Sequence, residues 1–345
     1  MGRGKQTGSK EKFGSENKTI FNIPIHYAAF WHIPVVTHII GALSLARIVR
    51  RLSRGYQGRV VVIAYNQLWH YLPSLFWSKI FGNKIYLDLE DGNTTPNNLL
   101  QGVSDKIRHS LFDHYCNAGA LLAASSLKNQ VRTKNTFVCY GCAEIQPRNQ
   151  KIWALPPIRI LFGGSLYQET GVKLLMDAIS ILESQRPDLK QNMQFTITGY
   201  GAMSKVLSDF SETAGKGWIE FLGDVDRDKY LQNLYSAHIG LCLKLSTSEM
   251  GQTTFPSKII EYASYGLAII STQVSDVPAL LDHESAILLQ DETPEHLFSI
   301  FQKIGEGAYD LQALGKKGQQ KINSTCSSEI VGKNLAQFLM KDTER

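Results

Sequence analysis

Short apolar runs alternate with stretches of helical periodicity through most of the sequence. The apolar runs are rich in β-branched residues and nearly continuous, which is typical of strands buried on both faces of a parallel sheet. In the first half they occupy residues 59–66, 84–91, 121–125 and 136–141, and in the second half residues 158–164, 193–199, 219–224, 239–244, 267–272 and 286–290. Helical patterns lie at residues 172–186, 202–214, 226–236, 256–265, 294–305, 309–322 and 328–341. The alternation predicts an α/β fold with parallel sheets.

Two domains are expected from the length of 345 residues and from one break in the pattern. Residues 148–159, RNQKIWALPPIR, contain two adjacent prolines and lack periodicity, so we place the domain boundary there. The predicted organisation is a polar tail at 1–19, a first domain at 20–150 and a second domain at 151–345, whose last helix is able to return to the first domain. The six strands of the second domain complete a doubly wound sheet. The four of the first predict a short or incomplete domain.

The composition excludes a disordered or fibrous chain, because 43% of the residues are hydrophobic and 10% are aromatic. The five cysteines are scattered. Cys139 and Cys142 form a C-x-x-C, but no second pair accompanies them, which weighs against a zinc or redox site. This cysteine usage fits a reducing, cytoplasmic compartment.

Positive charge is concentrated at the front of the chain. The whole sequence carries a net charge of +5, while residues 1–60 hold ten Lys/Arg and two Glu. A basic front on a nearly neutral body predicts an anionic partner, either membrane lipid or nucleic acid. Nucleic acid is disfavoured because the basic stretch lacks interleaved aromatic residues and shows no helix-turn-helix or zinc-finger pattern.

Residues 20–46 carry no formal charge and are long enough to suggest a transmembrane span. Pro24 and Pro34 would break a continuous helix there. Residues 35–52 instead predict an amphipathic helix that either packs on a domain or lies at a membrane interface. In the second case it would attach the protein peripherally to an anionic membrane through the arginines at its end, which are Arg47, Arg50, Arg51 and Arg54. The first nineteen residues lack the apolar core of a signal peptide.

Candidate binding residues lie where strands of the second domain end, because ligands of open parallel sheets bind beyond the carboxyl ends of the strands. The run 158–164 ends in Gly164 followed by Ser165, and the run 193–199 ends in Gly199, followed closely by Gly201. Small residues at such turns let backbone N–H groups approach a phosphate. The alternative is that these glycines only allow strand and helix to pack closely.

The segment 244–281 is the most informative part of the sequence. A polar loop leads to a helix that is expected to start near Pro256, which places Ser257 and Lys258 in its first turn. Lys258 and Glu261 are three residues apart and share one helix face. A diphosphate at the start of this helix and ribose hydroxyls on Glu261 would together hold a nucleotide. The alternative is an ordinary surface Lys–Glu pair.

PSKIIEYASYGLAIIST resembles the nucleotide-sugar motif of group 1 (family four) retaining glycosyltransferases. ILFGGSLYQETGVKLLMDAI, FTITGYGAM and IEFLGDVDRDKYLQNLYSAHIGLCLK resemble further donor-domain segments of that family, in the same order and spacing. The resemblance spans about residues 155–300. It implies the GT-B fold, with two facing Rossmann-like domains, and sugar transfer from a nucleoside-diphosphate-sugar with retention and without a metal or other cofactor.

The sequence also departs from the family. Ser165 and Thr170 stand where the family usually has Arg and Lys, so the candidates for binding the diphosphate become Lys244 and Lys258. Of the family's two glutamates, Glu261 matches the second, while the first position holds Thr253 and the nearest upstream carboxylate is Glu249. Further candidate catalytic groups end a strand of the first domain and are expected to orient the acceptor or the donor sugar. They are Asp88, Glu90 and Asp91, and a solvated loop is their alternative explanation.

The sequence therefore predicts a glycosyltransferase acting on a glycan or lipid-linked acceptor, in the synthesis of surface polysaccharide or a glycoconjugate. Two alternatives stay open. One is a nucleotide-sugar epimerase of the same fold, which would release a new nucleotide sugar without an acceptor. The other is a truncated, non-catalytic remnant that binds a nucleotide or a partner.

Overall fold

The computed structural model describes residues 12–31, 36–90, 92, 96, 98–146, 153, 155–214 and 216–341. The chain divides into two compact units. Unit 1 comprises Met1–Leu122, Leu127–Val138 and Phe338–Arg345, and unit 2 comprises Ala123–Ser126 and Cys139–Gln337.

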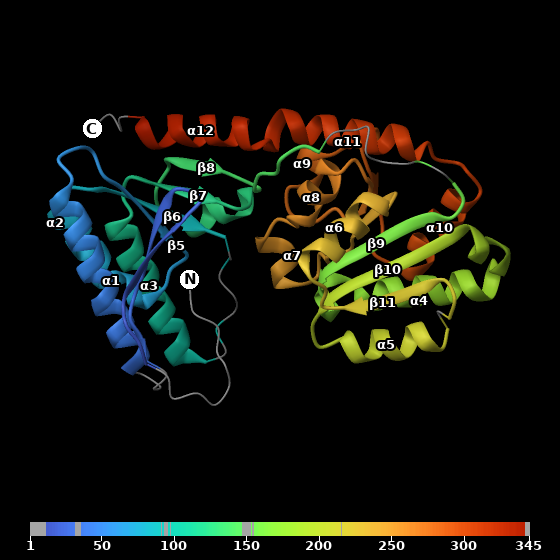
Figure 1. The fold of residues 1–345 in the computed structure, drawn as a ribbon, viewed down its shortest axis with the longest axis horizontal. Helices are drawn as coiled ribbons and strands as arrows, with labels where there is room; N and C mark the ends of the chain where they lie inside the picture. Colours follow the sequence, from blue (N-terminus) through green and yellow to red (C-terminus); the bar gives the residue numbers. More distant parts are fainter. Residues whose placement is uncertain are drawn as a thin grey trace. The chain divides into compact units, whose positions relative to one another are not determined.

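Unit 2 is built on a parallel sheet, whose strands β9, β10 and β11 lie side by side in Figure 1. The strands of this sheet are β9 (Ile158–Ser165), β10 (Met193–Tyr200), β11 (Ile219–Gly223), β12 (Ile239–Cys242), β13 (Ala268–Ser271) and β14 (Ile287–Leu288). Among the described residues they form a six-stranded sheet in the order β11-β10-β9-β12-β13-β14. The order runs outward from β9 in one direction and then from β12 in the other, which is the doubly wound arrangement.

Helices cover both faces of this sheet because side chains of successive strand residues point to opposite faces. The helices of unit 2 are α4 (Val172–Gln185), α5 (Ser204–Glu212), α6 (Arg227–Ser236), α7 (Glu249–Thr253), α8 (Lys258–Ser264), α9 (Val277–Leu280), α10 (Pro294–Gly305) and α11 (Leu311–Cys326), with 3₁₀ turns η4 (Gln168–Thr170) and η5 (Pro187–Asn192). Ile160 and Phe162 of β9 join one buried cluster with α4, α5 and α10, while Leu161 joins a second cluster with α8, α9 and α11.

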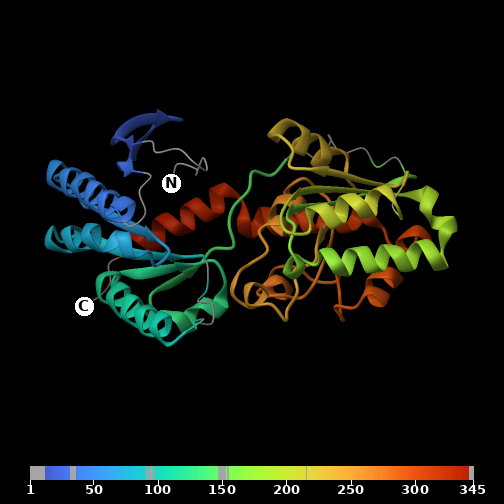
Figure 2. The same cartoon turned by 90° about the horizontal axis from the view of Figure 1, so that it is seen from below.

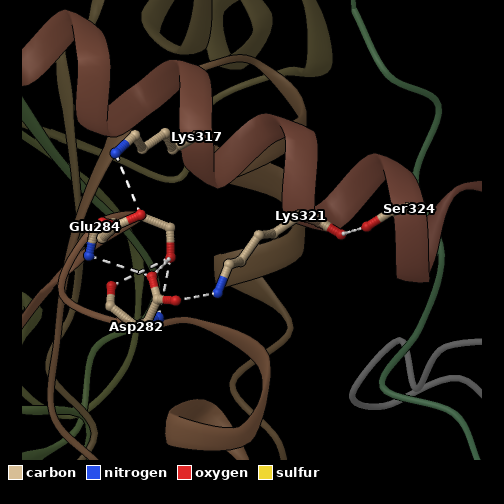
Figure 3. Close-up of polar contacts among 6 residues, drawn as sticks. Asp282, Glu284, Lys317, Lys321 and Ser324 are labelled. Atoms are coloured by element: carbon tan, nitrogen blue, oxygen red, sulfur yellow. Dashed lines mark hydrogen bonds and ion pairs between the residues drawn. The ribbon is translucent and has the colours of Figure 1, made fainter.

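Helix α11 is tied to the loop before β14 by two ion pairs, shown in Figure 3. Lys317 Nζ lies 3.3 Å from Glu284 Oε2, and Lys321 donates to Asp282 Oδ2. Hydrogen bonds from Lys321 and Ser285 lower the pKa of Asp282 to about 2. Both pairs are exposed to solvent, so they orient the loop more than they stabilise it.

The sequence-based element predictions for unit 2 are confirmed. Every predicted strand and helix from residue 158 onward is present within a few residues of its predicted bounds. The short helices α7 and α9 were not predicted, because helices of one turn carry too little periodicity to recognise.

Unit 1 contains a parallel sheet in the order β5-β6-β7-β8. Its strands are β5 (Val61–Tyr65), β6 (Lys84–Leu89), β7 (Gly119–Leu122) and β8 (Thr136–Val138), which confirms the predicted set for this half. Helical elements of unit 1 are α1 (Val36–Gly55), α2 (Leu72–Ile80) and α3 (Leu99–Tyr115), with 3₁₀ turn η1 (Trp69–Tyr71), while η2 (Ser125–Gln130) falls in both units. Helix α3 escaped prediction because Phe112 is its one buried residue, which leaves it without a clear apolar stripe.

The end of the last helix, α12 (Ser328–Met340), belongs to unit 1. The ring centroid of Phe338 lies 5.5 Å from that of Tyr86 and 5.5 Å from that of Phe137. The Tyr86 hydroxyl donates to the carbonyl of Leu339 at 3.3 Å. The end of α12 thereby packs on β6 and β8 of the first half.

Among the described residues, four short strands precede α1, although the sequence predicted no strand before residue 59. β1 (Lys12–Phe13) pairs antiparallel with β4 (Phe30–Trp31), and β2 (Glu16–Ile20) pairs antiparallel with β3 (Ile23–Tyr27). In Figure 2 these strands (dark blue) lie beside α1. They escaped prediction because all five residues of β2 are exposed and therefore show no pattern of burial.

The amphipathic helix predicted at 35–52 is confirmed as α1, whose buried residues are Ala42, Ser44 and Ala46. In the part of the chain that the structure describes, no helix is long and apolar enough to cross a membrane.

The two compact units meet in the chain at Val138 and Cys139, earlier than the boundary expected within 148–159. Half of that segment, namely residues 148–152 and 154, lies outside the described residues. Trp153 stacks on His238 of unit 2, with ring centroids 5.4 Å apart. The described part of the predicted linker therefore packs on unit 2.

The backbones of β9 and β10 approach each other closely at Gly164 and Gly199. Gly199 has φ +134°, and a Cβ there would lie 1.8 Å from the Gly164 carbonyl oxygen. Gly217 has φ +93°, but a Cβ there would meet nothing within 4 Å.

We expect Gly199→Ala to be far more destabilising than Gly217→Ala. Backbone strain alone costs about 1 kcal/mol, which lowers the unfolding midpoint by roughly 2–4 °C in Gly217→Ala. In Gly199→Ala the clash adds roughly 1–3 kcal/mol, so the midpoint should fall about twice as far or more. Thermal unfolding followed by circular dichroism checks this, and equal shifts in the two variants would contradict it.

Candidate functional site

The candidate site lies at the switch point of the unit 2 sheet, where β9 and β12 are neighbours but the winding reverses. A pocket of about 250 Å³ opens at the ends of these two strands. Its lining includes Gly164 and Ser165 at the end of β9, Lys244 after β12, and Ser257 and Lys258 at the start of α8. Three of the predicted donor-binding segments thus converge on one cavity.

Gly164 allows this convergence. It has φ +128°, a conformation that residues with a side chain rarely adopt, and a Cβ at this position would point at Lys258 Cε, 3.6 Å away. Beside it, the Gly163 amide donates to the Tyr262 hydroxyl at 2.9 Å, so α8 is hydrogen-bonded to the strand end. Burial raises the pKa of Tyr262, which stays a neutral hydroxyl in this position.

The structure assigns a packing role to the other two predicted glycines. Gly199 contacts the Gly164 backbone as described above, and a Cβ on Gly201 would lie 2.2 Å from the Leu166 carbonyl oxygen. Neither residue lines the pocket at the switch point. Of the two alternatives for these turns, close packing of the chain accounts for both residues.

Helix α8 starts at Lys258 with Ser257 as its N-cap residue, two residues later than Pro256. Lys258 Nζ lies 2.5 Å from Glu261 Oε2, so the pair that the sequence placed on one helix face is formed. About a third of each side chain is exposed. The pair is therefore accessible to a ligand as well as partly shielded from water.

Tyr230 of α6 completes this group, and sequence reasoning missed it. Its hydroxyl donates to Glu261 Oε2 at 2.7 Å and accepts from Lys258 Nζ at 2.8 Å. Burial, followed by the neighbouring Tyr262 and the charge of Glu261, raises the pKa of Tyr230. One tyrosine on an amphipathic helix, about thirty residues from its partners, carries no sequence signal for this contact.

A second pocket, of about 440 Å³, borders on the first at Lys258. Ser257 and Lys258 line both pockets, and Glu261 and Arg227 line the second one. Residues of the segment after β8 complete it, among them Tyr140 and Gln146. The two pockets with Lys258 between them can hold an elongated ligand whose anionic centre lies at the lysine and whose hydroxyls reach Glu261.

The remaining lysine and glutamate candidates are placed differently. Lys244 lines the first pocket, and its Nζ donates to Thr254 Oγ1 at 2.5 Å. Glu249 is exposed at the start of α7 and is not among the residues that line either pocket. The structure therefore brings Lys244 to the site and leaves Glu249 outside these two cavities.

Of the three first-domain carboxylates, Asp91 lies outside the described residues, while Asp88 and Glu90 stand at the end of β6 in unit 1. Glu90 accepts from the Tyr65 hydroxyl at 2.9 Å, and its amide donates to Asn66 Oδ1 at 2.9 Å. Burial, and then the negative charge of Glu90, raises the pKa of Asp88 to about 6.

Within the described ranges, no group of three or more His, Cys, Asp or Glu side chains is placed to hold a metal ion.

Comparison with known proteins connects this geometry to a family. Residues 157–304 match the family of glycosyl transferases group 1. The amylovoran biosynthesis glycosyltransferase AmsK of Erwinia amylovora is 23% identical over 185 residues, which is 53% of this chain and 44% of AmsK. The gpi3 subunit of the phosphatidylinositol N-acetylglucosaminyltransferase of Schizosaccharomyces pombe is 28% identical over 192 residues, which is 55% of this chain and 39% of the subunit. The matches thus span less than half of either relative.

Solved structures share the fold over most of the chain. Anabaena HepE in complex with UDP superposes with a TM-score of 0.67 at 14% identity, covering 87% of this chain and 83% of that chain. TarM superposes with a TM-score of 0.65 at 11% identity, covering 94% of this chain and 63% of that chain. The α/β fold with parallel sheets is therefore the GT-B fold.

The raised pKa of Asp88 predicts a specific dependence of stability on pH. A carboxyl that titrates near 6 when folded and near 3.9 when unfolded binds more protons in the folded state. Its contribution to stability is present below pH 4 and is lost as the pH rises to about 6. Asp88→Asn lacks this loss, so the variant should gain stability over the parent protein between pH 4 and 6.

Denaturant unfolding of both proteins at pH 4, 5, 6 and 7 measures this difference. Glu90→Gln removes the second cause of the raised pKa, and it should move the upper end of the window to lower pH. A constant difference between Asp88→Asn and the parent at all four pH values would contradict the prediction.

Proposed function

We propose that this chain, whose residues 157–304 form a group 1 glycosyl transferase domain, transfers a sugar from a nucleoside-diphosphate-sugar to an acceptor. The observation that carries the proposal is the placement of Lys258 between two pockets, with Glu261 in one of them and the Gly164–Ser165 turn in the other. A diphosphate between a nucleoside and a sugar has this layout, with its negative charge in the middle.

In the proposed complex the diphosphate lies against Lys258, with Lys244 as the second cation and the Gly164–Ser165 backbone alongside. The ribose hydroxyls donate to Glu261, which the hydrogen bond from Tyr230 holds in place. Transfer breaks the bond between the anomeric carbon and the diphosphate oxygen and forms a bond from that carbon to an acceptor hydroxyl oxygen. The leaving diphosphate takes the electron pair and accepts the proton of the acceptor hydroxyl. Fixed positive charge at that oxygen stabilises the transition state more than the ground state.

Several finer features belong to the same proposal. We propose that the sugar is transferred with retention of the anomeric configuration. We also propose that lysines, in place of a metal ion, neutralise the negative charge of the diphosphate. Asp88 and Glu90 of unit 1 are our candidates for orienting the acceptor. The acceptor we propose is a glycan or a lipid-linked glycan in the assembly of a polysaccharide or glycoconjugate. The names of AmsK and of the gpi3 subunit, which refer to amylovoran biosynthesis and to phosphatidylinositol, support the proposed acceptor.

We further propose that the protein works at the cytoplasmic face of a membrane, to which its α1 arginines attach it peripherally. A lipid-linked acceptor would be presented there, so attachment would keep the enzyme at its substrate.

The lysine between the pockets gives the first test. Lys258→Met should weaken binding of UDP, the nucleotide in the HepE structure, by about 10- to 150-fold, because a hydrogen bond to a charged group contributes roughly 1.5–3 kcal/mol. Uridine lacks the diphosphate and should lose much less affinity. Titration calorimetry with both ligands measures the two losses, and Lys303→Met on the exposed face of α10 is the matched control.

Equal losses for UDP and uridine in Lys258→Met would mean that the lysine does not bind the diphosphate. Glu261→Ala should show no such preference: both ligands should lose about 10- to 150-fold in affinity, because both contain the ribose.

Activity itself is tested by incubating the protein with UDP-sugars and a panel of glycan and lipid-linked acceptors. UDP release that depends on an acceptor, and that falls in Lys258→Met, is the expected result. A new nucleotide sugar formed without an acceptor would identify an epimerase. Tight UDP binding without turnover on any acceptor would favour a non-catalytic remnant.

A further inference from the structure

The hairpin of β2 and β3 in unit 1 carries an unusual residue at its turn. Ile20 pairs with Ile23, so Phe21 and Asn22 are the two turn residues, and both have positive φ, +49° and +63°. Two-residue turns of this kind favour Asn, Asp and Gly, because a bulky side chain is strained at positive φ. Asn22 fits this rule, whereas Phe21 violates it.

Phe21 is also 93% exposed, so it gains no burial that would offset the strain. Its neighbours Ile20 and Ile23 are 41% and 63% exposed, which makes the whole tip of the hairpin apolar. Phe21 thus combines two unfavourable features, backbone strain and an exposed aromatic ring. Together they indicate that its side chain contacts a binding partner outside this chain.

The rest of unit 1, to which the hairpin belongs, also exposes more large apolar side chains than unit 2 does. Among the described residues, exposed large hydrophobic side chains in unit 2 are confined to Leu155, Tyr167, Tyr200 and Val206. Unit 1 has many more, and Ile39 and Leu43 are two of them, one turn apart on α1. The apolar surface is therefore a property of unit 1.

At the base of the hairpin lies a groove of about 340 Å³ that combines this apolar surface with positive charge. Ile40, Leu43 and Ile48 of α1 form its apolar part, and Arg47 and Arg51, one turn apart, lie beside them. Ser15 and Ala29 line the groove from the hairpin side, and the Ala29 amide donates to Ser44 Oγ at 2.9 Å. Neither arginine forms an ion pair with any carboxylate in the described part of the chain.

Arg50 is engaged differently. Its guanidinium lies 4.4 Å from the centre of the Trp77 ring of α2, which holds α1 against α2. Arg47 and Arg51 of α1 thus line the groove, whereas Arg50 packs on the protein.

We propose that the hairpin tip and this groove bind an anionic phospholipid bilayer, with a lipid phosphate at Arg47 and Arg51 and Phe21 inserted among the acyl chains. The pairing of guanidinium groups with an apolar floor matches a lipid, which joins a phosphate to hydrocarbon. A five-residue hairpin is about 16 Å long. With its tip about 5–10 Å deep, the arginines at its base stay within about one Debye length of the anionic surface.

This inference turns the peripheral attachment proposed above into a defined site, and it does not depend on sugar transfer. The experiment is co-sedimentation of the full chain with vesicles of phosphatidylcholine alone or mixed with phosphatidylglycerol. Binding to the anionic vesicles should be stronger and should weaken in high salt. The double variant Arg47→Ala/Arg51→Ala should bind them about 25-fold more weakly, at about fivefold per basic residue.

Two further variants separate this site from general effects. Lys205→Ala/Lys303→Ala removes the same charge from exposed positions of unit 2 and should bind like the parent. Phe21→Asn removes the apolar tip but suits a positive φ, so it should bind about tenfold more weakly to the anionic vesicles while its unfolding midpoint stays equal or rises.

Equal losses in the two double variants would overturn the groove site in favour of non-specific attraction. Unchanged binding in Phe21→Asn would overturn insertion of the hairpin. Displacement of the protein from vesicles by millimolar inorganic phosphate, or by RNA, would show that the arginines bind a free phosphate or a nucleic acid instead. UDP affinity should be the same in all these variants, so failure of the membrane site leaves the donor site untouched.

Discussion

The arrangement of unit 2 depends on one constraint, which is that β9 pairs in parallel with β10 on one side and with β12 on the other. Because the chain winds outward in both directions from this pair of strands, the loops after β9 and β12 diverge and leave a crevice between their ends. The close backbone contact between Gly164 of β9 and Gly199 of β10 keeps one wall of this crevice compact. The start of α8 provides the other wall. The pocket, the lysines and the tyrosine hydrogen bond to Gly163 all follow from that geometry.

Within the crevice, Lys258, Glu261 and Tyr230 form a group without net charge. Partly shielded charges are costly unless they are paired and hydrogen-bonded, and each of these three groups satisfies the other two. The same hydrogen bonds hold the lysine and the carboxylate in fixed positions. A ligand with an anionic centre and a pair of hydroxyls therefore meets groups that are already oriented, which reduces the entropy lost on binding.

Unit 1 follows different physical rules. Its parallel sheet has a buried core in β6 and β7. Its first strands and α1, however, expose large apolar side chains, whereas the strands and helices of unit 2 bury most of theirs. Asp88 at the end of β6 is held in surroundings that disfavour its charge. Such departures from local rules are expected at functional surfaces, and here they lie at two places, the end of the sheet and the N-terminal hairpin.

The sequence by itself determined the parallel strands and the helices of unit 2, because strands buried on both faces read as continuous β-branched runs whatever their neighbours are. It also determined that Lys258 and Glu261 share a helix face, since three-residue spacing on a helix fixes this locally. Only the tertiary structure decided that Tyr230 reaches this pair and that Gly199 serves packing, because both depend on elements that are far apart in the chain. The N-terminal hairpin was invisible in the sequence for a related reason: its strands are exposed, so backbone pairing and not a hydrophobic pattern defines them.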